Sequence, residues 1–119
     1  MIDNVHQANR ILLSFIVRER AHRAHVFRKD PAKLAEKLAQ CDGALQRLEH
    51  MIQGGPVSID KSYRFIKALI KGEEFWRGKI FQGQQREDKL ADCAKAYAAL
   101  LFLHETPAPV EPEQLSLLG

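Results

Sequence analysis

Hydrophobic residues recur at helical spacing along the first part of the chain. Residues 4–29 contain no Gly or Pro, and their apolar side chains return every three or four positions. These positions are Val5, Ala8, Leu12, Phe15 and Ile16. Asp3 is the expected N-cap, and Asp30-Pro31 ends this helix and begins the next, with proline in its first turn. The pattern predicts a first helix within residues 4–29.

The second stretch has the most regular spacing. Its apolar positions alternate between steps of four and three residues, as in the seam of a helical bundle. They are Leu34, Leu38, Cys41, Leu45, Leu48 and Ile52. The segment Gln53-Gly54-Gly55-Pro56 ends the helix, because glycine accepts a left-handed conformation and proline cannot continue a helix. We therefore expect a second helix that begins at Pro31 and is stopped by Gln53-Gly54-Gly55-Pro56.

A third helix is predicted to begin after Ser58, which is its expected N-cap. Its apolar face is formed by Ile59, Tyr63, Ile66 and Ile70, and is widened by Phe65 and Leu69. Gly72 and Gly78 weaken the helix, because glycine loses more backbone entropy than other residues when it becomes helical. We expect the helix to break near residue 72, before Phe75-Trp76.

The fourth predicted helix covers residues 85–104 and follows a boundary at Gly83. Its apolar face is formed by Leu90, Cys93, Ala94, Tyr97, Leu100 and Leu101. Several alanines favour the helix and allow close approach of a neighbouring one. Since no segment shows sustained alternation of apolar and polar residues, we expect no strands. The predicted fold is all-α, a bundle of about four helices over residues 1–105, with a Pro-rich C-terminal tail expected to be flexible.

Composition places the chain among soluble globular proteins. Its 119 residues are 45% hydrophobic and 28% charged, which fits one domain with a tail. No uninterrupted apolar stretch is long enough for a transmembrane helix, and the N-terminus lacks the features of a secretion signal. Cys41 and Cys93 lie in predicted helices and suit a reducing compartment, either as buried free thiols or as a pair. We therefore expect a cytoplasmic protein without a membrane partner.

The C-terminal tail differs from the rest of the chain. Residues 106–113 carry three prolines and two glutamates, which favour an extended spacer. Residues 114–119 then place three leucines within six positions. Apolar clusters without local cover often mark binding sites. The tail is therefore a candidate linear motif, with a C-terminus that folds back on the bundle as the alternative.

The pentapeptide Gln114-Leu115-Ser116-Leu117-Leu118 resembles the motif with which bacterial proteins bind the DNA sliding clamp. That motif has Gln, Leu, Ser or Asp, Leu, and then Phe or Leu, and all five positions here fit, with Leu118 in place of the commoner Phe. A chance match in a chain of this length is expected about once in a thousand. The resemblance covers five of 119 residues and does not extend to the helical body.

The resemblance implies a role for each residue of the pentapeptide. Leu117 and Leu118 would fill a hydrophobic pocket between clamp domains, and Leu115 would rest on its rim. The Gln114 amide both donates and accepts hydrogen bonds, so it would fix direction and register. Ser116 would favour a local turn or face solvent. We expect a non-enzymatic replication or repair protein that docks on the clamp as an adaptor or inhibitor.

The helical body is basic, which supports a different function. The chain has a net charge of +3, but its last fifteen residues hold three glutamates and no basic residue, so residues 1–104 carry 18 basic against 12 acidic side chains. Two helical stripes are candidate nucleic-acid contacts: Arg18, Arg20, Arg23 and Arg28, and Lys61, Arg64, Lys67 and Lys71. Alternatives are a solvated surface, a helix–turn–helix formed by residues 34–52 and 58–71, and a phage or mobile-element inhibitor of a host protein.

Sequence patterns for catalysis or cofactor binding are weak. His22 and His25 share a helical face with Glu19, but three neighbouring arginines would repel a cation. Asp88 and Asp92 are four residues apart and fit a solvated helix face better than an acid–base pair. No phosphate-binding glycine loop, nucleophile elbow or zinc motif occurs, so we expect no catalytic residues, metal or cofactor. The aromatic residues Phe75, Trp76 and Phe81 suit the core or a dimer surface.

Overall fold

The computed structural model describes residues 2–106, which form four α-helices. These are α1 (Val5–Val26), α2 (Pro31–Gln53), α3 (Ile59–Ile80) and α4 (Gly83–Glu105). No strand occurs in this part of the chain. The predicted all-α bundle of four helices is confirmed. Apart from Thr106, the predicted spacer and the pentapeptide motif lie outside the described residues.

The helix ends follow the predicted capping chemistry in two of three cases. The side chains of Asp30 and Ser58 accept hydrogen bonds from the third backbone N–H of α2 and α3, at 3.2 Å and 3.1 Å. The predicted N-cap Asp3 is wrong by one residue. Asn4 has the extended backbone of an N-cap, and its side chain accepts from the Gln7 N–H at 2.8 Å. Gly54 has a φ of 86°, which explains why glycine ends α2.

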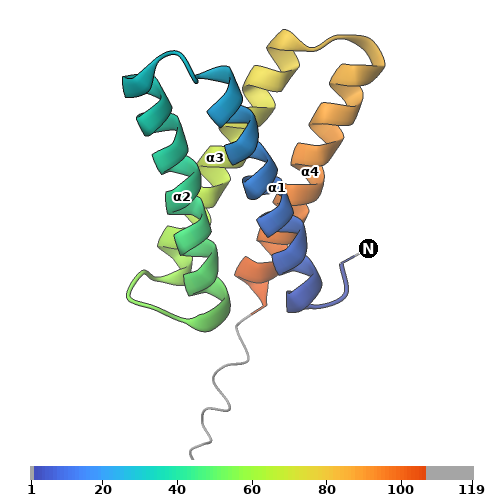
Figure 1. The fold of residues 1–119 in the computed structure, drawn as a ribbon. Coiled ribbons are helices and arrows are strands. Elements are labelled where there is room, and N and C mark those ends of the chain that lie inside the picture. The colour runs from blue at the N-terminus through green and yellow to red at the C-terminus, as the bar shows by residue number, and fades with distance from the viewer. Residues whose placement is uncertain (1, 107–119) are drawn as a thin grey trace, which may run out of the picture.

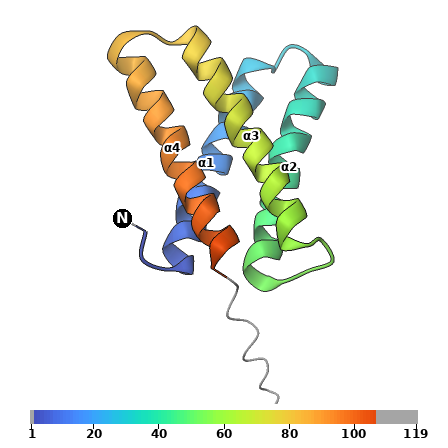
Figure 2. The ribbon, with the colours of Figure 1, turned by 180° about the vertical axis from the view of Figure 1, so that it is seen from behind.

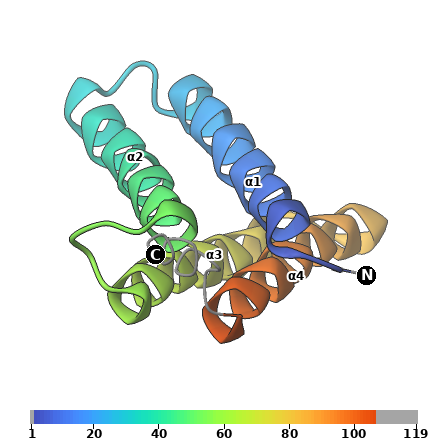
Figure 3. The same cartoon turned by 90° about the horizontal axis from the view of Figure 1, so that it is seen from below.

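The four helices form two hairpins that cross. Figures 1 and 2 show α1 with α2 in one hairpin and α3 with α4 in the other, with the turns at one end spread apart. Seen from below, the two hairpins form two layers (Figure 3). Each helix packs on the next along the chain, and α4 packs on α1. The radius of gyration is 15.7 Å, whereas a compact domain of this size would have about 13 Å, so the shape is open.

The hydrophobic core lies where the hairpins meet. On α2 the buried residues are Cys41, Ala44, Leu48 and Met51, so only two positions of the predicted seam are fully covered. Leu45 and Ile52 are half-buried at the edge of the core. The core face of α2 is therefore rotated toward Ala44 and Met51, because α2 packs both on α1 of its own hairpin and on α3 of the other.

The predicted break in the third helix is wrong. The helix α3 continues through Gly72 and Gly78 to Ile80. On either side of Gly72, Ile70 is fully buried and Arg77 donates to Asp92 of α4 at 3.1 Å. Tertiary contacts on both sides therefore outweigh the low helix propensity of glycine, which costs about 1 kcal/mol per position.

Replacing Gly72 with alanine is expected to raise the free energy of unfolding by about 0.5–1 kcal/mol, because a Cβ at this helical position would meet no atom within 4 Å. Urea unfolding followed by circular dichroism measures the change. Gly43→Ala is the matched control inside a helix, since its Cβ would lie 3.0 Å from the Phe65 ring. An equal gain from both variants would show that space at the site does not decide the outcome.

The two hairpins are repeats of one another. The segment Lys37-Leu38-Ala39-Gln40-Cys41 of α2 recurs in α4 as Lys89-Leu90-Ala91-Asp92-Cys93. The pair Glu19 and Arg23 of α1 likewise recurs in α3, 54 residues later, as Glu73 and Arg77. Because the turn between α3 and α4 is two residues shorter than that between α1 and α2, the offset falls to 52 in the second helix of each hairpin.

The buried residues follow the same offsets. Ala8, Leu12, Phe15 and Ile16 of α1 correspond to Ser62, Ile66, Leu69 and Ile70 of α3, and all eight are buried. Cys41, Ala44, Leu48 and Met51 of α2 correspond to Cys93, Ala96, Leu100 and Leu103 of α4, and all eight are again buried. The core is therefore built from two copies of one hairpin pattern, facing each other.

Candidate functional site

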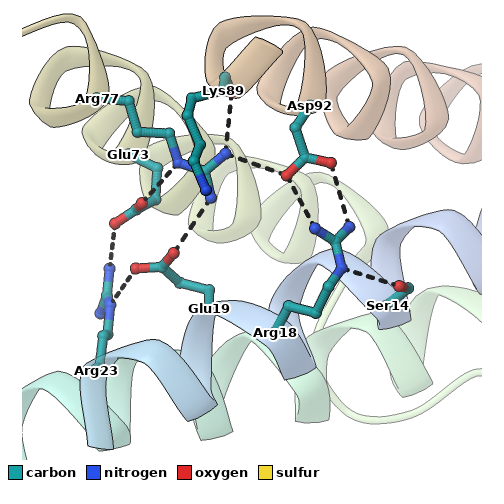
Figure 4. A network of polar contacts seen from close by, with 8 residues as sticks. All are labelled: Ser14, Arg18, Glu19, Arg23, Glu73, Arg77, Lys89 and Asp92. Carbon is teal, nitrogen blue, oxygen red and sulfur yellow. Dashed lines mark hydrogen bonds and ion pairs between the residues drawn. The ribbon is translucent and has the colours of Figure 1, made fainter. Parts of the chain in front are cut away.

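Six charged side chains form a network between the two hairpins (Figure 4). We call it the central ionic network. Its members are Arg18, Glu19 and Arg23 of α1, Glu73 and Arg77 of α3, and Asp92 of α4. Glu19 is 3% exposed and Arg23 is 8% exposed, although neither lies at a position that the apolar pattern marked as core. The network joins α1 to α3 across the centre of the bundle.

Arg23 anchors one side of the network. Its Nε donates to Glu19 Oε2 at 2.8 Å, and its Nη2 donates to Glu73 Oε2 on the opposite hairpin at 3.3 Å. Its Nη1 donates to two acceptors on α2, the Lys37 carbonyl at 3.0 Å and Gln40 Oε1 at 2.8 Å. All the nitrogens of this buried guanidinium therefore have partners, as burial of a charge requires.

Arg77 makes the equivalent contacts from the second hairpin. Its Nε donates to Glu73 Oε1 at 3.1 Å and its Nη2 to Glu19 Oε1 at 3.4 Å. Its Nη1 donates to the Lys89 carbonyl at 3.0 Å and to Asp92 Oδ2 at 3.1 Å. Lys89 and Asp92 correspond by the repeat offset to Lys37 and Gln40. Each arginine thus binds the glutamate of its own hairpin and the glutamate of the other hairpin, and an approximate two-fold axis relates the two sets of contacts.

Arg18 breaks this symmetry. It binds both carboxylate oxygens of Asp92 at 3.2 Å and also donates to the Ser14 hydroxyl at 3.2 Å. The corresponding residue of α3 is Gly72, and the partner Asp92 corresponds to the uncharged Gln40. The extra acid and the extra base therefore occur together, on the seam between α1 and α4.

Burial shifts the pKa values of the acidic members in different directions. Burial and the neighbouring Glu73 carboxyl raise the pKa of Glu19 to about 7, against the opposing effect of Arg23. Burial would also raise the pKa of Glu73, but the hydrogen bond with Glu19 and the charges of Arg77 and Arg23 outweigh it and lower that pKa. Of the two carboxyls, Glu19 therefore has the higher pKa.

The free energy of unfolding of the parent protein is expected to fall between about pH 4.5 and pH 7. Glu19→Gln should remove this fall. The raised pKa means that the folded state binds a proton at Glu19 more tightly than the unfolded state. That stabilisation is complete below the unfolded pKa and is lost as pH rises through 7, a loss of about 1–3 kcal/mol. Urea unfolding at pH 5, 6, 7 and 8 measures it, with exposed Glu49→Gln as control. A decline of the same size in Glu19→Gln would contradict the assignment.

The eight predicted nucleic-acid contacts have different environments. Arg23 is held in the central ionic network. Four others are in ion pairs: Arg18 with Asp92, Arg20 with Asp42, Arg64 with Asp60 and Lys71 with Glu74. Arg28 donates to the His25 carbonyl at 2.7 Å, while Lys61 and Lys67 form no ion pair within residues 2–106.

The structure does not join the two basic stripes into one surface. The α1 stripe lies toward the turn between α1 and α2, and the α3 stripe lies toward the opposite end of the molecule (Figure 1). On α3, the ammonium groups of Lys67 and Lys71 lie over the rings of Tyr63 and Tyr97, at 5.7 Å and 4.6 Å from the ring centroids. Nucleic-acid contact by these residues stays a prediction.

The remaining chemical candidates are placed as follows. Glu19 lies in the network rather than beside His22 and His25, which are exposed. In the part of the chain that the structure describes, no three His, Cys, Asp or Glu side chains converge on a point that could hold a metal ion. Asp92 is bound by two arginines, whereas Asp88 lies on the surface. Neither aspartate faces an acid–base partner.

The structure distinguishes between free thiols and a disulfide for the cysteines, and it places Phe75 and Trp76 outside the core. Cys41 and Cys93 are both buried free thiols, which confirms that alternative over a disulfide. Phe75 and Trp76 are 60% and 55% exposed and form an edge-to-face pair, so Trp76 is not a core residue. A dimer surface there stays a prediction. None of the helices within residues 2–106 has an apolar stretch sufficient to cross a membrane.

A groove of about 870 Å³ runs along the seam between α1 and α4. Its apolar lining includes Ile2, Ile11, Leu101 and Phe102, and its basic lining includes Arg10 and Lys95. The groove also contains Glu105, the last residue of α4, so the tail leaves the helical body at its edge. No sequence pattern predicted this groove, because its two walls are 74 or more residues apart in the chain.

Comparisons with protein-family models, with curated proteins and with solved structures find no match to this chain. The five residues of the predicted clamp-binding motif, Gln114 to Leu118, lie outside the described residues. The chain combines a helical body, which has a charged centre and a groove between α1 and α4, with a tail that resembles the clamp-binding motif at five positions.

Proposed function

We propose that this protein acts by binding, and that it docks on the bacterial DNA sliding clamp through Gln114–Leu118. The match at all five motif positions carries this proposal. The helical body would be the second functional part, and the protein would serve replication or repair as an adaptor or as an inhibitor of other clamp partners. No catalytic step or cofactor is part of the proposal.

The end of the folded body supports docking by the tail. The helix α4 ends at Glu105, and Thr106 is the last described residue, so eight residues separate Glu105 from Gln114. Eight residues span at most about 28 Å when extended. That reach allows the pentapeptide to enter a cleft on another protein while the helical body stays outside it. Single linear motifs of this size bind with micromolar affinity, because ordering the chain offsets part of the apolar burial.

The choice between clamp docking and direct nucleic-acid binding rests on charge. Five of the eight candidate basic residues already bind a carboxylate within the protein. A phosphate would compete with those carboxylates, which lowers the net gain of each contact. The pentapeptide needs no such exchange. The basic body is therefore the weaker candidate for the main activity.

Replacing both Leu117 and Leu118 with alanine is expected to weaken binding to a purified bacterial sliding clamp about 30- to 1000-fold. The two truncations remove about 2–4 kcal/mol of apolar burial. Isothermal titration calorimetry with the full chain measures the change. The matched control replaces two exposed apolar residues of α1, Leu13 and Val17, by alanine and should leave the affinity unchanged. Failure of the parent chain to bind, or equal binding by the Leu117/Leu118 variant, would refute the proposal.

A further inference from the structure

The repeat predicts how the seam between α1 and α4 would be filled if the hairpins were identical. In the equivalent seam between α2 and α3, Phe65 packs against Gly43, where an added Cβ would lie 3.0 Å from the ring. The Arg47 guanidinium covers the same ring at 4.0 Å from its centroid. The corresponding residues on the other side are Ile11, Lys95 and Ala99. Ile11 is smaller than Phe65, and Ala99 has no guanidinium to cover it; Ile11 and Lys95 line the groove of about 870 Å³ between α1 and α4.

The repeat also relates the two chain exits. Thr106, at the end of α4, corresponds to Gly54 at the end of α2. After Gly54 the chain turns back over the helix end, and Gly55 lies so close to the His50 ring that no Cβ would fit. His50 corresponds to Phe102, which lines the groove. The φ of Thr106 is −116° where that of Gly54 is 86°, so the two exits differ in direction, and the repeat relates Phe102 to the ring that the chain covers after α2.

The groove and the tail are chemically complementary. The groove offers the apolar side chains of Ile11, Leu101 and Phe102. Of its charged lining, Arg18 binds Asp92, which leaves the cations Arg10 and Lys95 against the single carboxylate of Glu105. Neither cation forms an ion pair within residues 2–106. Residues 107–119 contain three leucines and one valine, and their only charged side chains are Glu111 and Glu113. Acidic and apolar groups on the tail thus match basic and apolar groups in the groove.

We propose that residues 107–118 dock into the α1–α4 groove of their own chain, with their leucines against its apolar lining and Glu111 and Glu113 facing Arg10 and Lys95. The regulatory part of this proposal rests on the proposed clamp docking. While the pentapeptide lies in the groove, it is not available to the clamp. A clamp must displace the tail from the groove before it binds Leu117 and Leu118. The helical body thereby lowers the affinity of its own tail for the clamp.

The tail is long enough for this contact. The wall of the groove on α4 extends from Asp92 to Glu105, which is about 20 Å at 1.5 Å per residue. Twelve extended residues reach up to about 40 Å, twice that length. The excess allows residues 107–109 to turn at the end of α4 before the chain enters the groove. The tail is tethered at the edge of the groove, so its effective concentration there is high. The groove is therefore occupied even if the tail binds it weakly.

Amide chemical shifts in the full chain test the intramolecular contact without a clamp. Shortening the chain to end at Thr106 should shift the amide signals of groove residues such as Ile11, Leu101 and Phe102. Arg10→Glu combined with Lys95→Glu in the full chain should release the tail and give signals near those of the short form. Lys29→Glu with Lys33→Glu, in the turn between α1 and α2 and the first turn of α2, is the matched control. Identical groove signals in the full and shortened chains would overturn the proposal.

Affinity for the purified clamp tests the competition. A peptide of residues 106–119 should bind the clamp about fivefold or more tightly than the full chain, since coupled equilibria of this kind differ by 5- to 150-fold. The Arg10→Glu/Lys95→Glu chain should approach the peptide, and the Lys29→Glu/Lys33→Glu chain should not. Equal affinity of peptide and full chain would refute the competition while leaving clamp docking intact. A peptide that does not bind the clamp would refute the clamp docking instead, and the chemical shifts would then decide the groove contact alone.

Discussion

Replacing Arg77 with methionine is expected to lower the free energy of unfolding by about 3–5 kcal/mol, which is the cost of removing one partner from a buried ion pair. Arg77 contacts Glu73, Glu19 and Asp92, so its loss leaves three carboxylates at the centre with fewer opposite charges. Methionine keeps much of the side-chain volume and can still lie near the Phe15 ring, which the guanidinium faces at 5.2 Å. The loss therefore reports on charge rather than on packing.

Equilibrium unfolding in urea, followed by circular dichroism at 222 nm, measures this effect. The repeat makes Arg23→Met an internal replicate, since Arg23 makes the equivalent contacts and is expected to cost about as much. Arg20→Met is the control, because Arg20 pairs with Asp42 on the exposed surface, where an ion pair contributes little. A change for Arg77→Met no larger than that for Arg20→Met would show that the central network does not hold the hairpins together.

The sequence alone was sufficient to predict the helices. Their apolar spacing and their capping residues Asp30 and Ser58 are local features, and local features determine where helices begin. Apart from the N-cap of α1, which is Asn4 rather than Asp3, the mistakes occurred where distant contacts decide the outcome. Continuation of α3 through Gly72 depends on packing against other helices, and so does the rotation of the α2 core toward Ala44 and Met51. Those contacts are made by residues far apart in the sequence, which the spacing of apolar residues within one helix does not reveal.

The central ionic network could have been found in the sequence by comparing the chain with itself. Glu19 and Arg23 belong to a stretch so rich in charge that they looked like a solvated surface. Their recurrence as Glu73 and Arg77, at the same offset as the apolar core residues, is what distinguishes them. A charged pair that recurs at the same offset as the core residues lies at equivalent positions of the two hairpins. In a two-hairpin bundle that place is the interface.

The groove could not be predicted in this way. It lies along the seam that departs from the repeat, where Ile11 stands in place of Phe65 and Ala99 in place of Arg47. Whether such a departure leaves a space or is filled by neighbouring atoms depends on how the helices sit against one another. The pentapeptide is the reverse case, since its five residues are readable in the sequence and lie outside the described structure.

The thiols of Cys41 and Cys93 are expected to react with a thiol reagent about 10³- to 10⁴-fold more slowly in the native protein than in urea. Both side chains are fully buried, and burial raises the pKa of Cys41 and raises that of Cys93 to about 11, so little thiolate forms. Reaction then requires opening of the core, and a domain stable by 5 kcal/mol or more opens rarely. Absorbance of the released thiol leaving group gives both rates. Reaction within seconds in the folded protein would show that the core opens locally.

The same two thiols test whether the hairpins open together. Cys41 lies on α2 and Cys93 on α4, at equivalent positions of the repeat, so each reports on one hairpin. Arg77 binds carboxylates on α1, α3 and α4, which ties the second hairpin to the first. Arg77→Met should therefore accelerate both reactions by the same factor, about 10²- to 10⁴-fold for a loss of 3–5 kcal/mol. Mass spectrometry of digested, labelled protein separates the two sites. Selective acceleration at Cys93 would mean that the hairpin of α3 and α4 unfolds alone and that the network does not couple the two repeats.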